Sequence, residues 1–140
     1  MSPILKCYLT AVLLAGVQTA TADDPKSDDV KTLCELSSHA QAYNGSRIKV
    51  EGVLSWHPHG PTFIGGAQCP NERAIVRRLS NYTENPDAAR FASEVHKNGG
   101  RAYVVYEGSF RVLDGITCSP VTFCSQYSIE VQRLVSARPY

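Results

Sequence analysis

The stretch Tyr43-Asn-Gly-Ser-Arg-Ile-Lys-Val-Glu-Gly-Val-Leu-Ser-Trp56 is the strongest indicator of how this 140-residue chain folds. Apolar side chains recur there at every second position, at Ile48, Val50, Leu54 and Trp56. Polar residues take most of the positions between them, and a period of two is typical of a strand with one buried face. Gly52 interrupts the apolar row, and a glycine inside a strand often marks a bulge or bend. The stretch therefore predicts a half-buried strand that bends at Gly52.

The first 22 residues have the features of a secretory signal peptide. Lys6 precedes an apolar run from Tyr8 to Val17, and Ala20-Thr21-Ala22 provides a small-residue cleavage site. The apolar run is too short to span a bilayer, and no later segment approaches that length. We therefore expect an exported protein, periplasmic or secreted, that starts at Asp23 and has no membrane span.

The remaining part of the chain, residues 23–140, has a length typical of one domain. Removing Lys6 from the 14 basic residues leaves 13, against 13 acidic residues, so the formal net charge becomes zero. General binding to nucleic-acid phosphates requires clustered positive charge. The composition therefore disfavours a nucleic-acid partner.

Apolar periodicity and turn signals predict five strands and two helices in this domain. The predicted order is a helix over 27–42, strands over 47–56, 62–64 and 74–79, a helix over 86–97, and strands over 101–113 and 127–135. Gly108 interrupts the fourth strand as Gly52 interrupts the first, which predicts a strongly coiled sheet. A parity change at Leu134-Val135 predicts an irregularity near Gln132. The segment over 114–126 is predicted to be a loop.

Three strands, a helix and two more strands make up the order of the OB-fold, a five-stranded Greek-key barrel. The sequence therefore predicts a mainly β domain, an OB-fold-like barrel with a helix between its third and fourth strands and an extra N-terminal helix. The segment Tyr43-Asn-Gly-x-x-Ile-x-Val-x-Gly52, preceded by a helix with one cysteine, resembles small exported bacterial OB-fold proteins of uncharacterised function. This resemblance carries over no catalytic residues, and we predict no cofactor.

Four cysteines remain after export, Cys34, Cys69, Cys118 and Cys124. An even number in an exported domain indicates two disulfides, for which three pairings exist. We favour a bond between Cys34 and Cys69, which would attach the first helix to the barrel, and a bond between Cys118 and Cys124 across a short loop. A zinc site of four thiolates needs paired short spacings such as Cys-x2-Cys, and this chain has none.

His57 and His59 form a His-x-His pair in the first loop between strands. On a strand this spacing puts both imidazoles on one side, as metal chelation requires. Pro58 breaks regular strand pairing, however, and no carboxylate or cysteine lies nearby in the sequence. The pattern favours a solvated loop, and we predict no bound metal.

Motifs for catalysis are not found: the sequence has no Gly-x-Ser-x-Gly, no His-Glu-x-x-His and no phosphate-binding glycine loop. Glu51, Glu107 and Arg111 do not obviously converge as the acidic and basic groups of a nuclease would. The sequence therefore predicts an exported, disulfide-stapled binding module without catalytic activity, whose ligand is an unidentified protein, peptide or oligosaccharide. The alternatives are single-stranded nucleic-acid binding, which OB-folds achieve with basic and aromatic side chains, and a secreted metal-dependent nuclease.

We expect the ligand on the face of the first three strands, flanked by the loops over 57–61 and 114–126, because OB-folds bind through that face. The candidate ligand-binding residues are Trp56, His57, His59, Phe63 and Tyr106.

Overall fold

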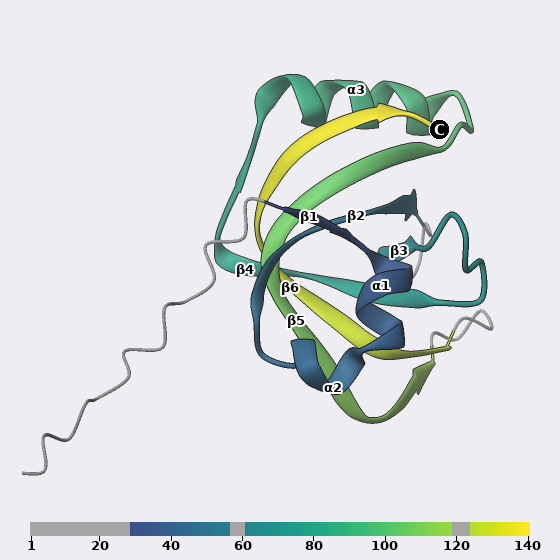
Figure 1. Ribbon diagram of the computed structural model, residues 1–140. Coiled ribbons are helices and arrows are strands. Elements are labelled where there is room, and N and C mark those ends of the chain that lie inside the picture. The colour runs from purple at the N-terminus through teal and green to yellow at the C-terminus, as the bar shows by residue number, and fades with distance from the viewer. Residues whose placement is uncertain (1–28, 57–60, 119–123) are drawn as a thin grey trace, which may run out of the picture.

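The computed structural model describes residues 29–56, 61–118 and 124–140. In chain order its elements are β1 (Val30–Thr32), α1 (Leu33–Ser38), α2 (Ala40–Tyr43), β2 (Arg47–Ser55), β3 (Phe63–Gly65), β4 (Arg73–Glu84), α3 (Pro86–Lys97), β5 (Ala102–Cys118) and β6 (Cys124–Pro139). The described part is mainly β, as the sequence predicts, and its long strands curve strongly (Figure 1). The predicted signal peptide at 1–22, together with His57 and His59, lies outside the described residues.

Among the described residues, backbone pairing joins five strands into a closed ring. β2 pairs with β3, β3 with β4, β4 with β6, β6 with β5, and β5 again with β2. Every pairing in the ring is antiparallel except that of β4 with β6, which is parallel. β1 lies outside the ring and runs parallel to β2. The sheet therefore has six strands where the sequence predicts five.

The prediction of one N-terminal helix over 27–42 is wrong in its first turn. β1 occupies that part of the chain, and its backbone groups pair with β2 instead of with each other. The hydroxyl of Thr32 accepts a hydrogen bond from the N–H of Glu35 (3.2 Å), so the helix is capped later than predicted. α1 then buries Leu33 and Leu36 completely, and the short α2 follows it.

Gly52 lies at a point of close approach inside the ring. A Cβ at this position would lie 3.0 Å from the carbonyl oxygen of Gly65 and 3.0 Å from the Cβ of Ile64, both on β3. Gly52 also lies between two pairing segments on the same edge of β2. β1 pairs with Lys49–Glu51 before it, and β3 pairs with Val53–Ser55 after it. A side chain here would push β3 away from β2.

The other strand glycine, Gly108, lies at an even closer contact between backbones. A Cβ there would overlap the backbone carbonyl of Glu130, next to a shift in the β5–β6 register. The irregularity predicted near Gln132 is confirmed, because this residue has no pairing partner in either β4 or β5. Irregularities of this kind increase local twist, which allows long strands to curve.

The β5–β6 hairpin is longer than the sequence predicts. β5 continues to Cys118 and β6 begins at Cys124, so most of the predicted loop over 114–126 is strand. β4 likewise extends beyond the predicted range of 74–79, with a register shift between Arg78 and Thr83.

The helix predicted between the third and fourth ring strands is α3, and its signals are confirmed. The side chain of Asn85 accepts hydrogen bonds from the N–H groups of Asp87 and Ala88, and Pro86 occupies the first turn. α3 packs against β6 and β5 through its buried face (Figure 1). Among the residues described, none of the helices has the length and apolar character that a membrane crossing requires.

The core combines the inward faces of the ring strands with apolar residues of α1 and α3. Its members include Leu33, Leu36, Ile48, Val50, Leu54, Ile64, Ala88, Val104, Tyr106, Phe110, Ile129, Val131 and Leu134. The alternation that the sequence predicts for 47–56 is therefore confirmed, with Ile48, Val50 and Leu54 facing inward.

Candidate functional site

Three of the five residues that the sequence predicts to bind a ligand lie in the described part of the chain, and they differ in burial. Trp56 is half-buried, and its ring lies 4.3 Å from the ring of His96 on α3 (centroid to centroid). Phe63 and Tyr106 are each only 1% exposed. His57 and His59 lie outside the described residues. That these residues bind a ligand stays a prediction, but the burial of Phe63 and Tyr106 gives both a packing role.

Phe63 and Tyr106 occupy different surroundings. Tyr106 belongs to the core cluster, and burial raises the pKa of its hydroxyl group. Phe63 of β3 lies directly opposite Ile75 of β4, and both are buried without belonging to that cluster. Of the three predicted residues in the described part of the chain, only Trp56 therefore has a substantially exposed side chain.

A groove of about 200 Å³ lies where five segments meet. It is lined by Thr32, Leu33 and Cys34 at the β1–α1 junction, Glu51 and Gly52 of β2, Gly66, Ala67 and Gln68 after β3, Tyr103 of β5 and Arg138 of β6. We call this set of residues the β1–β6 groove. Segments that are distant in the sequence form its walls, and the following contacts fix their positions.

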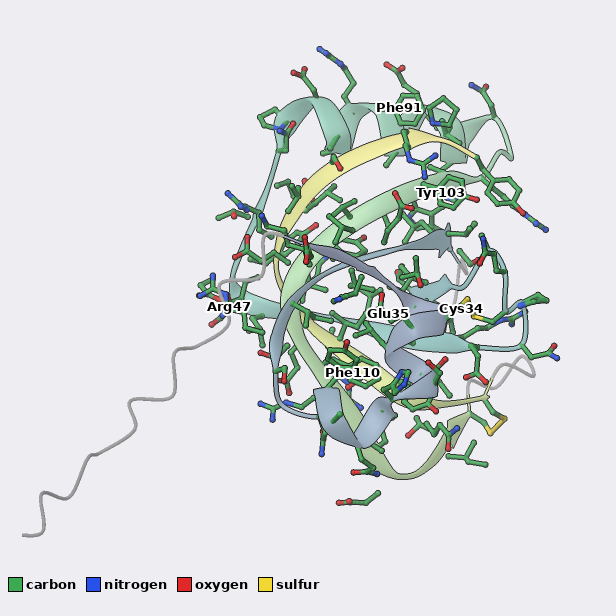
Figure 2. All side chains as sticks on the ribbon, in the orientation of Figure 1. Cys34, Glu35, Arg47, Phe91, Tyr103 and Phe110 are labelled. Carbon is green, nitrogen blue, oxygen red and sulfur yellow. A yellow bond between two sulfur atoms is a disulfide. The ribbon has the colours of Figure 1, made fainter. Side chains whose placement is uncertain are left out.

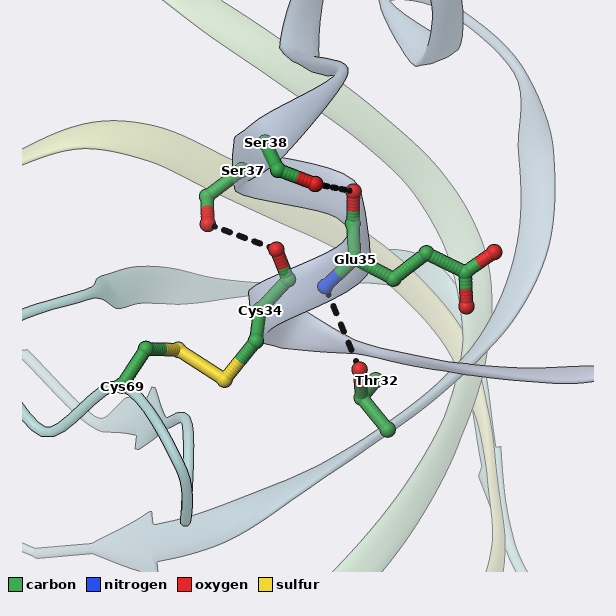
Figure 3. Close-up of a disulfide and its surroundings, with 6 residues drawn as sticks. All are labelled: Thr32, Cys34, Glu35, Ser37, Ser38 and Cys69. Atoms are coloured by element: carbon green, nitrogen blue, oxygen red, sulfur yellow. Dashed lines mark hydrogen bonds between the residues drawn. A yellow bond between two sulfur atoms is a disulfide. The ribbon is translucent and has the colours of Figure 1, made fainter.

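The disulfide between Cys34 and Cys69 fixes one wall of the groove (Figure 3). It confirms the pairing that the sequence favours and joins α1 to the segment between β3 and β4, with a Cα–Cα distance of 5.7 Å. Gly66 lies directly against it, since a Cβ on this residue would overlap both sulfur atoms. The second predicted bond, between Cys118 and Cys124, is also confirmed and closes the β5–β6 hairpin. Two disulfides are consistent with an oxidising compartment outside the cytoplasm.

An ion pair between Glu51 and Arg138 fixes the opposite wall. Nη2 and Nε of Arg138 donate hydrogen bonds to the two carboxylate oxygens of Glu51, at 3.0 and 3.2 Å. The same guanidinium lies 4.1 Å from the ring centroid of Tyr103, its cross-strand partner on β5. Bidentate pairing and stacking on an aromatic ring both restrict the conformation of an arginine. The ring of Tyr140 also contacts Tyr103, with 5.2 Å between the two ring centroids.

The basic residues on the outer faces of β2, β5 and β6 are largely paired with glutamates. Arg47 and Arg133 both donate to Glu107, at 2.8 and 2.7 Å, and Nε of Arg111 donates to Glu130 at 3.1 Å. Burial alone would raise the pKa of Glu107, but the hydrogen bonds from Arg47 and Arg133 outweigh it and lower the pKa below its usual value. On this outer surface, positive and negative side chains consequently pair with one another.

The described residues contain no group of three or more His, Cys, Asp or Glu side chains that could hold a metal ion. All four cysteines of the predicted mature chain are in disulfides and have no thiolate to offer as a ligand. The groove itself presents one ion pair, an aromatic ring and a glutamine. These groups can bind a ligand by hydrogen bonds and by apolar contact.

Sequence reasoning missed the groove. Tyr103 and Arg138 have no motif around them, and Glu51 looks like any other polar residue on the outer face of a strand. The one usable signal was Cys34 with Cys69, because their predicted bond brings the N-terminal segment next to the turn after β3. Comparisons with protein-family models, with curated proteins and with solved structures found no match to this chain.

Proposed function

We propose that this protein is an exported, disulfide-stapled, OB-fold-like module that binds a peptide or an oligosaccharide and inserts one residue of that ligand into the β1–β6 groove. The ring and its connections support the OB-fold-like assignment. In an OB-fold a helix joins the third and fourth strands of a five-stranded barrel, and here α3 joins β4 to β5 within a ring of five strands. β1, α1 and α2 are then additions at the N-terminal side.

The observation that carries the proposal is the fixed geometry of the β1–β6 groove. The Cys34–Cys69 bond holds one wall, and the stacked Glu51–Arg138 pair holds the other. A groove whose walls are already ordered loses little conformational entropy when a ligand enters. Ligand sites are usually preformed in this way and combine apolar surface with a few polar groups.

The size of the groove favours one unit of a longer ligand. Its volume of about 200 Å³ lies below the roughly 300–1,000 Å³ of pockets that enclose a whole small molecule. A single amino-acid side chain or one sugar ring is a better match to this space. The rest of such a ligand would lie over the exposed residues Ala67 and Gln68.

Charge pairing argues against the nucleic-acid alternative. Binding to single strands needs arginines and lysines that are available to phosphates. In the β1–β6 groove, the one basic lining residue, Arg138, already pairs with Glu51. The groove therefore suits a ligand with little net charge better than a polyanion.

The test is binding of the disulfide-intact protein to a peptide array and to an oligosaccharide array. We expect saturable binding to members of one array, and we expect Ala67→Trp to abolish it, because the indole would fill the groove from an exposed position. Ser93→Trp is the matched control, since Ser93 is exposed on α3 and does not line the groove.

Three results would contradict this proposal. One is equal binding by the Ala67→Trp and Ser93→Trp variants, and another is no binding on either array. The third is a salt-sensitive gel shift of a single-stranded DNA oligonucleotide that neither variant changes. Degradation of that DNA with Mg²⁺ or Ca²⁺ would instead support the nuclease alternative.

A further inference from the structure

A second hollow, separate from the β1–β6 groove, lies on the outside of the ring. It has a volume of about 290 Å³ and is lined by Arg47 of β2, Asn81 and Thr83 of β4, Glu107 of β5, and Gln132 and Arg133 of β6. We call these six residues the arginine hollow. Every one of its lining residues is polar, and none of them also lines the β1–β6 groove.

The two arginines of this hollow are held in place by one carboxylate. Nη2 of Arg47 donates to one oxygen of Glu107 at 2.8 Å, and Nη2 of Arg133 donates to the other at 2.7 Å. Arg47 projects outward on the side where β4 bends toward α3 (Figure 2). A guanidinium has five N–H donors in a rigid fork, so each arginine keeps further donors after binding Glu107.

Irregular strand pairing explains why β4 and β6 supply polar side chains at this point. The β4–β6 register shifts between Arg78 and Thr83, and Gln132 on β6 has no pairing partner in β4 or β5. Such irregularities re-aim side chains that a regular strand would direct elsewhere. Asn81, Thr83 and Gln132 thereby add amide and hydroxyl donors beside the two guanidinium groups.

The hollow therefore carries two positive charges and one negative charge, with three neutral side chains that can donate hydrogen bonds. Glu107 is ionised at neutral pH, because its pKa is lowered by the hydrogen bonds from both arginines although burial acts in the opposite direction. Paired arginines with a fixed fork geometry are the side chains best suited to planar or tetrahedral oxyanions. We propose that the arginine hollow binds one oxyanion, a carboxylate, sulfate or phosphate group, through the N–H donors of Arg47 and Arg133 that Glu107 leaves free.

This proposal goes beyond the function proposed above and does not depend on it, because the two sites share no residue. The hollow is open to solvent, and the side chains of Arg47 and Arg133 are 59% and 52% exposed. Solvent screening weakens ion pairs at exposed positions. We accordingly expect affinity in the millimolar range for an isolated anion.

The test is a titration followed by the NMR signals of the arginine side-chain Nε–H groups. Sodium sulfate, sodium phosphate and sodium acetate are added separately, with sodium chloride at matched ionic strength as the reference. We expect saturable shifts at Arg47 and Arg133 with at least one oxyanion and not with chloride, and the most effective salt identifies the anionic group. Arg47→Gln with Arg133→Gln should remove the saturable binding, whereas Arg90→Gln should retain it.

Arg90 is a suitable control because it lies on α3, outside the hollow, in an exposed pair with Asp87. Thermal unfolding establishes that each variant is folded. If the double variant does not fold, the two single arginine variants are used in its place. Shifts equal to those with chloride would overturn the proposal. So would saturable binding that survives loss of both arginines, or shifts that appear equally at Arg90.

Discussion

Glu51 and Arg138 lie 87 positions apart in the sequence, yet two hydrogen bonds of 3.0 and 3.2 Å join their side chains. β5 lies between β2 and β6 in the sheet, so this pair reaches across a whole strand and contacts Tyr103 on the way. The contact ties the end of β6 to β2 and at the same time forms a wall of the β1–β6 groove.

Replacing Glu51 and Arg138 with glutamine should reveal a measurable coupling between them. We expect a coupling energy of about 0.5–1 kcal/mol from a double-mutant cycle in urea, because exposed pairs give roughly 0.2–1 kcal/mol and bidentate ones lie at the upper end. The Asp87–Arg90 pair provides a comparison, since its side chains are more exposed. Equal coupling in the two pairs would show that stacking on Tyr103 and bidentate geometry add nothing.

Gly52 should tolerate a side chain poorly. Gly52→Ala would place a Cβ at 3.0 Å from the Gly65 carbonyl oxygen, and Gly52→Val would add two methyl groups to this contact. We expect Gly52→Val to lower the free energy of unfolding by about 2–3 kcal/mol, the upper part of the range for overpacked sites. Chemical denaturation measures this change. Gly115→Val is the control, because a Cβ at Gly115 would have no atom within 4 Å.

The period-two alternation of 47–56 allowed the opening strand to be predicted, because it reflects a physical constraint on that stretch alone: one face packs on the core and the other meets solvent. The cap and proline at Asn85 and Pro86 likewise depend on neighbours within one turn of helix. The prediction of a helix in the first turn of the N-terminal segment was wrong because the structure there depends on a distant contact. Val30 and Lys31 fit a helix locally, and only the edge of β2 makes them a strand.

The candidate site could not be predicted from the sequence, because it is formed by residues that are distant along the chain. Its walls meet because strand pairing brings β2, β5 and β6 together, and no local pattern marks Glu51, Tyr103 or Arg138 as neighbours. Phe63 shows that burial also depends on distant contacts, since the sequence of a short strand does not reveal that this side chain is only 1% exposed. Cysteines are the exception, because their chemistry restricts them to a few pairings.

The two disulfides should contribute unequally to stability. Closing the 35-residue separation between Cys34 and Cys69 is worth about 4 kcal/mol in the chain-entropy model, and closing the separation of 6 between Cys118 and Cys124 about 2–2.5 kcal/mol. We therefore expect the alanine pair at Cys34 and Cys69 to lower the free energy of unfolding more than the alanine pair at Cys118 and Cys124. Denaturant unfolding of both variants under oxidising conditions measures the difference. The reverse order would mean that the hairpin bond stabilises the native state by something other than loop closure.

The carboxylate of Glu107 should make stability depend on pH in a predictable direction. Hydrogen bonds from Arg47 and Arg133 lower its pKa in the folded protein below the ordinary value of 4.5, even though burial opposes them. A carboxyl group with a lower pKa in the folded state favours folding when it is ionised. Its stabilising effect is therefore complete at pH values above 4.5 and is lost as the pH falls through the lower, folded-state pKa.

Glu107→Gln removes this titration and leaves a side chain of similar size. We expect the variant to be less stable than the parent protein by about 1 kcal/mol near neutral pH, as for a well-formed pair of exposed ion pairs, and the difference to shrink in acid. Urea unfolding of both proteins across the acidic range measures it. Glu94→Gln is the control, because Glu94 is exposed on α3 and forms no side-chain ion pair within the described part of the chain. A stability difference for Glu107→Gln that stays constant from neutral to acidic pH would mean that the ionised carboxylate is not what stabilises the folded state there.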